Sequence, residues 1–243
     1  MRTLLIDGDI LVVSTGAAHE EEIDWGDDNW TLHCDVKAVK ASILAAVENM
    51  KRELDADDAI LTLSMGETFR HRLYGGYKSG RGRKPVGTGE VKRWLIEEHG
   101  AKFKPGIEAD DTMGILATHP KLIKGDKIIV SQDKDMLTIP GKLYRGGEVI
   151  DVSPGEARYN WMMQTLTGDV TDGYPGLKGM GPVKAAKVLD KVGPDEDPWP
   201  AVVAAYEKAG MTEEDALLQA RLARILHWTD YDFKAKEVKL WQP

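Results

Sequence analysis

Acidic side chains recur where predicted strands end and predicted helices begin. They form four groups along the chain: Asp7 and Asp9; Glu108, Asp110 and Asp111; Asp133 and Asp135; Asp169 and Asp172. In a parallel α/β sheet, ligands bind beyond the carboxyl ends of the strands, so we expect several of these groups to converge. Converging carboxylates are costly to bury, and Mg²⁺ or Mn²⁺ is the natural compensation. Two such ions commonly hydrolyse phosphodiesters, whereas each acid alone also fits a helix cap or a solvated loop.

Residues 70–84 contain six Lys or Arg residues and no acidic residue, in a chain whose formal charge is −8. Cations contact phosphates, and aromatic rings offer stacking surfaces for unpaired bases. The glycines of this segment predict a mobile loop that overhangs the acidic groups. The alternative is a solvated basic loop without a ligand. The DNA-binding residues predicted here are Arg70, Tyr74, Tyr77, Lys78, Arg81, Arg83 and Lys84.

A glycine-rich turn at 176–181 leads into a helix that begins at Pro182. Exposed amides and the positive end of a helix bind phosphate without reading base sequence. The spacing fits neither the dinucleotide-binding fingerprint nor the P-loop, and an ordinary turn between helices is the alternative. The predicted DNA contacts of the turn are Lys178, Gly179, Gly181, Lys184 and Lys187.

The elements that must position these residues alternate at first between strands and helices. Apolar runs predict strands at 3–6, 59–63 and 127–131, and helical spacing predicts helices at 35–54, 90–98 and 110–118. A hairpin is predicted around 146–147. Beyond it we expect helices at 153–168 and 182–192, a loop at 193–198, and two further helices, the second capped by Thr212. This pattern predicts an α/β fold with a mostly parallel sheet covered on both faces.

Composition narrows the class of protein. The 243 residues are 42% hydrophobic and 30% charged, which is typical of a soluble globular chain. One cysteine, Cys34, excludes an internal disulfide framework and a Cys-rich zinc site. No apolar run is long enough to span a bilayer, and no signal sequence is evident, so we expect a cytoplasmic protein without membrane contact. The net negative charge does not exclude a nucleic-acid partner. Salt screens distant charges, so the charge close to a binding surface decides whether nucleic acid binds there.

Five motifs, in this order, resemble the flap-endonuclease/5′-nuclease family. They are Leu-Leu-Ile-Asp-Gly-Asp (4–9), Phe-Arg (69–70) followed by Tyr-Lys-Ser-Gly-Arg (77–81), Glu-Ala-Asp-Asp (108–111), Ser-Gln-Asp-Lys-Asp (131–135), and Gly-Asp-Val-Thr-Asp (168–172) before the glycine turn. The C-terminal stretches 209–215 and 223–226 and the final Leu-Trp-Gln-Pro look closest to the 5′→3′ exonucleases of T-seven-type short-tailed bacteriophages. The family usually has an Asp after the second strand, where this chain has Ser64-Met65-Gly66, with Glu67 nearby.

The resemblance implies a PIN-like α/β nuclease domain at 1–152, with an arch-like basic segment at about 67–105. It also implies a helical region at 153–243 with a helix-hairpin-helix motif at about 165–192. The expected activity is 5′→3′ exonuclease or flap-endonuclease cleavage of duplex DNA, and of RNA in RNA–DNA hybrids, by a monomer in the host cytoplasm. The implied catalytic residues are Lys78, Arg81 and Asp133, with a K⁺ ion at 176–181. The implied ligands of two Mg²⁺ or Mn²⁺ ions are Asp7, Glu108, Asp110, Asp111, Asp133, Asp135, Asp169 and Asp172.

Two other functions remain open from the sequence. A phosphotransferase of the haloacid-dehalogenase type would use Asp7 as a covalent nucleophile, with Ser131 after another strand. That hypothesis leaves the basic segment and the glycine turn unexplained. A catalytically silent DNA-binding protein is the other, suggested by the absent acid after the second strand.

Overall fold

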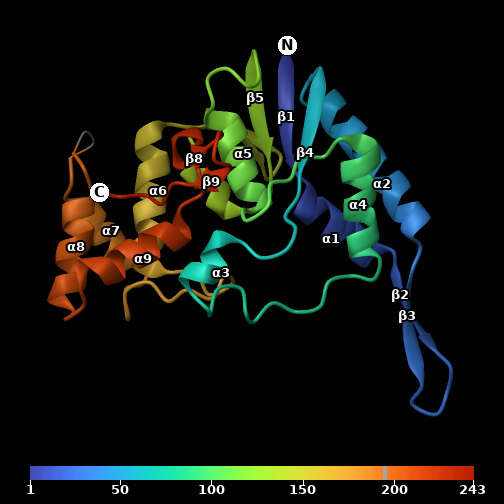
Figure 1. Cartoon of the computed structure of the whole chain (residues 1–243), viewed down its shortest axis with the longest axis horizontal. Coiled ribbons are helices and arrows are strands. Elements are labelled where there is room, and N and C mark those ends of the chain that lie inside the picture. Colours follow the sequence, from blue (N-terminus) through green and yellow to red (C-terminus); the bar gives the residue numbers. More distant parts are fainter. Residues whose placement is uncertain (194–195) are drawn as a thin grey trace.

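A five-stranded sheet forms the centre of the N-terminal half of the chain (Figure 1). The computed structural model describes residues 1–193 and 196–243. The strand order is β4-β1-β5-β6-β7, in which the first four strands are parallel and β7 runs antiparallel to β6. The mostly parallel sheet and the hairpin around 146–147 are therefore confirmed. The strands are β1 (Arg2–Asp7), β4 (Asp58–Thr62), β5 (Asp126–Val130), β6 (Gly141–Arg145) and β7 (Glu148–Val152).

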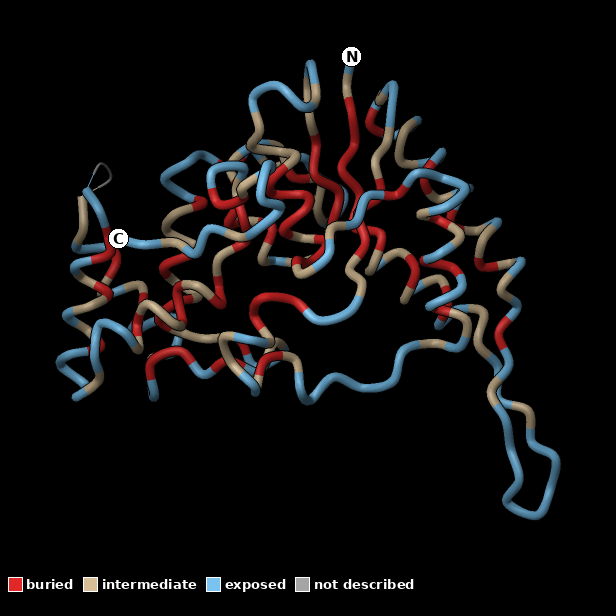
Figure 2. The backbone as a smooth tube through the Cα atoms, in the orientation of Figure 1, coloured by how far each residue is buried: buried red, intermediate tan, exposed pale blue. Residues whose placement is uncertain are grey.

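Helices cover both faces of this sheet. Leu4 and Ile6 of β1 pack into one apolar cluster with α1 (Gly8–Ala18), α2 (Val36–Glu53) and α4 (Thr88–His99). Leu5, which points to the other face, packs with residues of α5 (Ala109–Thr118), of the 3₁₀ helix η1 (Lys134–Thr138) and of α6 (Pro154–Thr167). The alternation of side chains along a strand thus divides the core into two layers, and the buried stretches of Figure 2 follow these strands.

The C-terminal half is helical, as predicted. Trp161 and Leu166 of α6 share a buried cluster with α7 (Pro182–Leu189), α8 (Trp199–Lys208) and α9 (Glu213–Ala223). The Thr212 capping box with Asp215 begins α9, as the sequence predicts. The chain then returns to α5 through η2 (Trp228–Asp230), β8 (Tyr231–Asp232) and β9 (Glu237–Val238).

Four features differ from the sequence predictions, and the first is a helix that was not predicted, α1. Helix α1 begins directly after β1, because Asp7 caps it by accepting the N–H of Ile10 at 3.0 Å. A Cβ at Gly8 would lie 2.6 Å from the carbonyl oxygen of Thr62, so only glycine fits this junction. Strands β2 (Glu20–Asp24) and β3 (Trp30–Cys34) form a hairpin that projects from the body (Figure 1).

The third difference lies in the basic segment, where α3 (Phe69–Leu73) is helical rather than a loop. Its Phe69 packs into a buried cluster with Ile107, Ile115 and Leu226, which holds the segment against α5. Helix α7 also ends earlier than predicted, at Leu189. Within the predicted loop at 193–198, Pro194 and Asp195 lie outside the described residues. Among the described helices, none is both long and apolar enough to cross a bilayer.

Candidate active site

Acidic residues from two neighbouring strands meet at the carboxyl edge of the sheet. Asp7 ends β1, and Asp133 follows β5 as the N-cap of η1. The Ser131 hydroxyl joins them: it donates to Asp7 at 3.0 Å and accepts the N–H of Asp133 at 3.1 Å. The parallel pairing of β1 with β5 therefore places these two groups side by side.

A second acidic group comes from the turn after α6. Asp169 accepts the N–H of Thr171 at 2.7 Å and that of Asp172 at 3.1 Å. The Lys134 ammonium of η1 lies 2.8 Å from Asp169, so it connects this turn to the strand-end group. Asp135 of η1 accepts a hydrogen bond from Gln164 of α6 at 2.6 Å, which makes a second connection.

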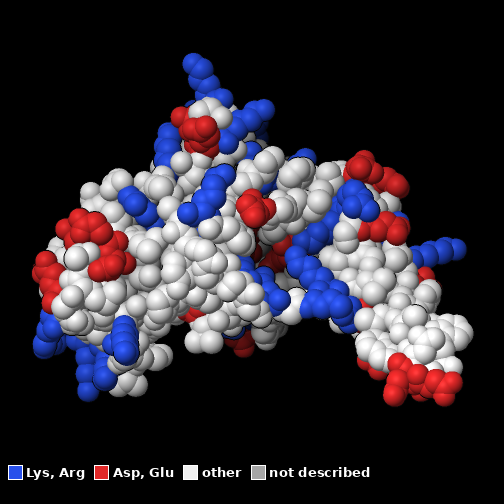
Figure 3. Space-filling view, turned by 60° about the horizontal axis from the view of Figure 1, so that its bottom comes forward, with Lys and Arg blue, Asp and Glu red and all other residues white. Residues whose placement is uncertain are grey.

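The basic segment closes the network between Glu108 and Asp172. The Lys78 ammonium contacts the Glu108 carboxylate and lies 3.5 Å from Asp172. The Tyr77 hydroxyl lies 2.7 Å from Glu108 and 3.0 Å from Asp172, so the two carboxylates share its single proton as hydrogen-bond acceptors. Arg81 adds an ion pair with Asp172 at 2.8 Å. Figure 3 shows acidic atoms in a hollow that Lys and Arg side chains border.

Lys78 adopts a left-handed backbone conformation, with φ of +54°. Neighbouring side chains of an extended chain point to opposite sides, whereas Tyr77 and Lys78 both reach Glu108 and Asp172. The Lys78 N–H also donates to the Asp172 carbonyl at 2.8 Å. The basic segment thus lies on the acidic turn, which agrees with the expectation that it overhangs the acids.

Burial and mutual repulsion raise the pKa of three carboxyls in this network. Burial, with Asp9 and Asp133 nearby, raises the pKa of Asp7 to about 6. Burial together with Asp133 and Asp169 raises the pKa of Asp135 to about 7. Burial and the charges of Asp7 and Glu108 also raise the pKa of Asp110. These carboxyls crowd one another enough that added positive charge would stabilise them.

Glu108 shows the opposite behaviour. Its burial alone would raise its pKa, but the charges of Arg70 and Lys78 outweigh that effect and lower the pKa to about 2. Glu108 is the N-cap of α5 and forms a capping box with Asp111. Among the described residues, no three Asp, Glu, His or Cys side chains are grouped so as to hold one metal ion. Lys78 and Lys134 lie among the carboxylates instead.

Three predicted site residues are buried and lie in other surroundings than the sequence suggested. Arg70 and Tyr77 were expected to contact DNA, but Arg70 is ion-paired with Glu108 and Asp111, and the Tyr77 ring is 3% exposed beside Tyr174. Neither side chain faces solvent, so the Tyr77 ring offers no open face on which a base could stack. Asp111 has no exposed surface and pairs with Arg70, although it was expected to be a metal ligand.

The other predicted DNA contacts of the basic segment lie nearer the surface. Tyr74 is half-buried against the C-terminal helical cluster. Arg83 is exposed and forms an ion pair with Glu20 at 2.6 Å, at the base of the β2–β3 hairpin. Lys84 is exposed as well.

The glycine turn brings its predicted residues to the surface together. Gly176 has a φ of +61°, and a Cβ there would lie 2.2 Å from the backbone nitrogen of Gly168, so the turn packs tightly on the end of α6. The Lys184 ammonium donates to the Gly179 carbonyl at 2.9 Å. Lys178, Gly179, Gly181, Lys184 and Lys187 are all exposed on this turn and on α7.

Asp9 has partners that were not predicted from the sequence. The Asp9 carboxylate accepts the N–H of Ser64 at 3.2 Å and pairs with the buried Lys92 of α4 at 2.5 Å. Ser64 in turn accepts the N–H of Ala109, next to Glu108, at 2.8 Å. A signal was available for Lys92, because it adjoins Val91 on the buried face of α4.

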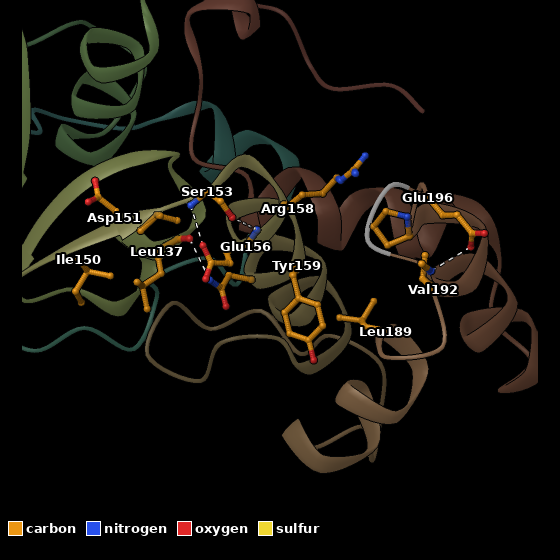
Figure 4. Close-up of a pocket in the computed structure, with 15 residues that line it drawn as sticks. Leu137, Ile150, Asp151, Ser153, Glu156, Arg158, Tyr159, Leu189, Val192 and Glu196 are labelled. Carbon is orange, nitrogen blue, oxygen red and sulfur yellow. Dashed lines mark hydrogen bonds between the residues drawn. The ribbon is translucent and has the colours of Figure 1, made fainter.

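A pocket of about 530 Å³ lies away from these carboxylates, between β7, α6 and the stretch after α7 (Figure 4). Leu137, Ile150, Tyr159 and Leu189 supply much of its apolar wall. The Ser153 capping box with Glu156 lies at its edge. None of its lining residues belongs to the predicted site, so this pocket is separate from the acidic network.

Comparison with known proteins identifies the family. The family model described as "5'-3' exonuclease, N-terminal resolvase-like domain" matches residues 2–152. The exonuclease of Escherichia phage T7 is 30% identical over 99% of this chain and 93% of its own length. The chain belongs to the 5′–3′ exonuclease family. This exonuclease is also similar to the exodeoxyribonuclease of Enterobacteria phage T3, at 29% identity over 99% of the chain and 92% of the relative.

A solved structure shares the fold of this exonuclease. The bacteriophage T5 flap endonuclease, in a complex with DNA and metal ions, superposes with a TM-score of 0.63 at 12% identity. The match covers 92% of this chain and 89% of that chain. The α/β fold with a C-terminal helical region, expected from the resemblance, is therefore confirmed. The enzyme is an exodeoxyribonuclease of the flap-endonuclease type, acting on DNA.

Proposed function

We propose that this exonuclease uses two divalent ions, Mg²⁺ or Mn²⁺, held by the acidic network. The supporting observation is that acids from four separate parts of the sequence are joined through Ser131, Lys134 and Lys78. The donor set consists of hard carboxylate oxygens, which Mg²⁺ and Mn²⁺ prefer. The flap endonuclease from bacteriophage T5 was crystallised with metal ions. The proposed ligands, direct or through water, are Asp7, Glu108, Asp110, Asp133, Asp135, Asp169 and Asp172.

Ions bound there would polarise the phosphate and lower the pKa of the attacking water. The protein itself supplies the remaining positive charge. Lys78 and Arg81 lie against Glu108 and Asp172, so both cations are at hand for a phosphate that enters the network. A preorganised cation stabilises the charge that develops on phosphate during cleavage, which assigns Lys78 and Arg81 catalytic roles.

The glycine turn at 176–181 is the proposed duplex-binding element. Its exposed lysines and the N-terminal end of α7 face solvent, where a phosphate backbone can approach. DNA held there would direct its 5′ end toward the basic segment. A K⁺ ion at this turn, cleavage of RNA in hybrids, a monomeric state and a cytoplasmic location stay predictions that rest on the family resemblance.

Digestion of labelled substrates tests this proposal. Duplex, flap and RNA–DNA hybrid substrates carry a label at either the 5′ or the 3′ end and are incubated with and without Mg²⁺. We expect short 5′-labelled products from duplex and flap DNA only when Mg²⁺ is present. Equal cleavage in a metal chelator would contradict the metal assignment.

A further inference from the structure

A buried ion pair lies directly behind Glu108. Arg70 of α3 is 2% exposed, and Asp111 in the first turn of α5 is fully buried. A guanidinium carries five N–H groups, and Arg70 uses all of them. Two donate to Asp111 at 2.7 Å each, and one to Glu108 at 3.0 Å. The last two donate to the carbonyls of Leu222, at 2.9 Å, and of Arg224.

Asp111 is equally saturated. Besides the two bonds from Arg70, it accepts the backbone N–H of Glu108 at 3.0 Å and that of Leu226 at 3.1 Å. A carboxylate offers about four lone-pair sites, and all of them are occupied here. Asp111 therefore has no oxygen free for a metal ion, and any ligand role would require it to leave Arg70.

These bonds connect three parts of the chain that are distant in sequence. Arg70 begins the basic segment, and Asp111 lies one turn into the helix that carries Glu108 and Asp110. Residues 222–226 comprise the last two residues of α9 and the three that follow it. Two backbone carbonyls and one backbone N–H of that last segment are bound by the pair. The C-terminal helical region is thus fastened to the acidic start of α5 by hydrogen bonds, not only by apolar packing.

We propose that Arg70 and Asp111 form a positioning pair that sets Glu108 and Asp110 for metal binding and makes their placement depend on residues 222–226. This proposal rests on the proposed function, because it takes Glu108 and Asp110 as ligands. Neither member of the pair touches metal or DNA. The pair acts by fixing the first turn of α5 and by holding one oxygen of Glu108.

The two roles open to Asp111 predict opposite effects of changing Arg70. If Asp111 were a ligand, loss of the Arg70 fork would free the Asp111 oxygens that it now occupies, so Mn²⁺ would bind as well or more tightly. If the pair positions Glu108 and Asp110, replacing either member weakens Mn²⁺ binding. Loss of a residue that orients metal ligands typically costs about 10- to 100-fold in metal affinity or activity.

The test is a Mn²⁺ titration of the full chain, followed by electron paramagnetic resonance. The variants are Arg70→Lys, which keeps the charge but lacks the five-donor fork, and Asp111→Asn, which places an N–H₂ among donors. We expect each to weaken Mn²⁺ binding about 10- to 100-fold and to lower kcat, with DNA affinity measured without metal unchanged. The double variant should be no weaker than the worse single variant, because the pair acts as a unit.

The matched control is Asp126→Asn, which disturbs an Asp bound to Arg2 at 3.0 Å and to Lys142 at 2.9 Å at the start of β5. It should keep wild-type Mn²⁺ affinity. If the single variants do not fold, the double variant Arg70→Met/Asp111→Leu is used instead. It replaces the buried ion pair with apolar side chains, a change that is often neutral or stabilising in other proteins. The folded double variant should still bind Mn²⁺ weakly.

Unchanged or tighter Mn²⁺ binding in Arg70→Lys would overturn the proposal. A lowered melting temperature with wild-type Mn²⁺ affinity and kcat would overturn it too, because the pair would then serve stability alone. A wild-type chain that binds no Mn²⁺ would instead overturn the proposed function, and this inference with it.

Discussion

The Tyr77→Phe variant keeps the aromatic ring and removes only the hydroxyl oxygen. It therefore tests whether this side chain has a structural role through its hydroxyl, as opposed to a role in base stacking through its ring. The ring is buried, and its hydroxyl lies 2.7 Å from Glu108 and 3.0 Å from Asp172. A hydrogen bond to a charged group contributes about 1.5–3 kcal/mol to stability. For a chain of this size each kcal/mol shifts the melting temperature by about 2–4 °C, so the loss should be about 3–12 °C.

The same change should slow cleavage about tenfold, because Glu108 and Asp172 lose a donor that orients them. Lys78 still bridges the two acids, which keeps the site from separating. Affinity for DNA without metal should not change, since the hydroxyl faces the protein interior. Circular dichroism melting, turnover of 5′-labelled duplex and fluorescence anisotropy measure the three quantities.

Tyr144→Phe is the matched control. Its hydroxyl also donates to a carboxylate, that of Glu53, but this hydrogen bond is exposed to solvent. It should leave melting temperature and turnover close to wild type. A Tyr77→Phe protein with wild-type melting temperature and wild-type turnover would refute the structural role, and the acids would then be held by the cations alone.

Three further results are expected. Asp133→Asn should abolish cleavage and leave DNA binding largely intact; retained turnover in excess Mg²⁺ would contradict its ligand role. Replacing Lys178, Lys184 and Lys187 by Ala should weaken duplex binding and reduce the slope of log K against log salt by about 3, whereas an unchanged slope would place the duplex elsewhere. Burial and the charge of Arg224 lower the pKa of His227 to about 4, so the unfolded chain takes up the proton first. Stability should therefore fall as pH drops from about 6.5 toward 4, by up to about 2 kcal/mol between pH 7 and pH 5. Urea unfolding of wild type and His227→Gln at both pH values tests this, and the variant should lose less stability.

The alternation of strands and helices was predictable because each element carries its own periodic signal. The apolar run of β1 and the capping residues Asp35, Ser153 and Thr212 identify their elements locally. Helix α1 was missed because it is apolar on nearly all sides and follows β1 without a turn. The β2–β3 hairpin was missed because β2 is acidic and both strands are mostly exposed, which hides the alternation typical of a strand.

The acidic network was predictable as a set, because strand ends in a parallel sheet share one edge. The partner of each acid was not. Arg70 and Tyr77 carry the composition of a DNA-binding loop, and only the packing of Phe69 against α5 turns them inward. Asp111 differs from Asp110 by one position on a helix, which is enough to bury it completely beside Arg70.

An anomalous-difference map from crystals grown with Mn²⁺ would test directly whether the acids act together on bound ions. We predict manganese peaks among Asp7, Glu108, Asp110 and Asp133 and toward Asp169, with none at Asp111. A map without manganese among these side chains, from crystals of active enzyme, would contradict the account.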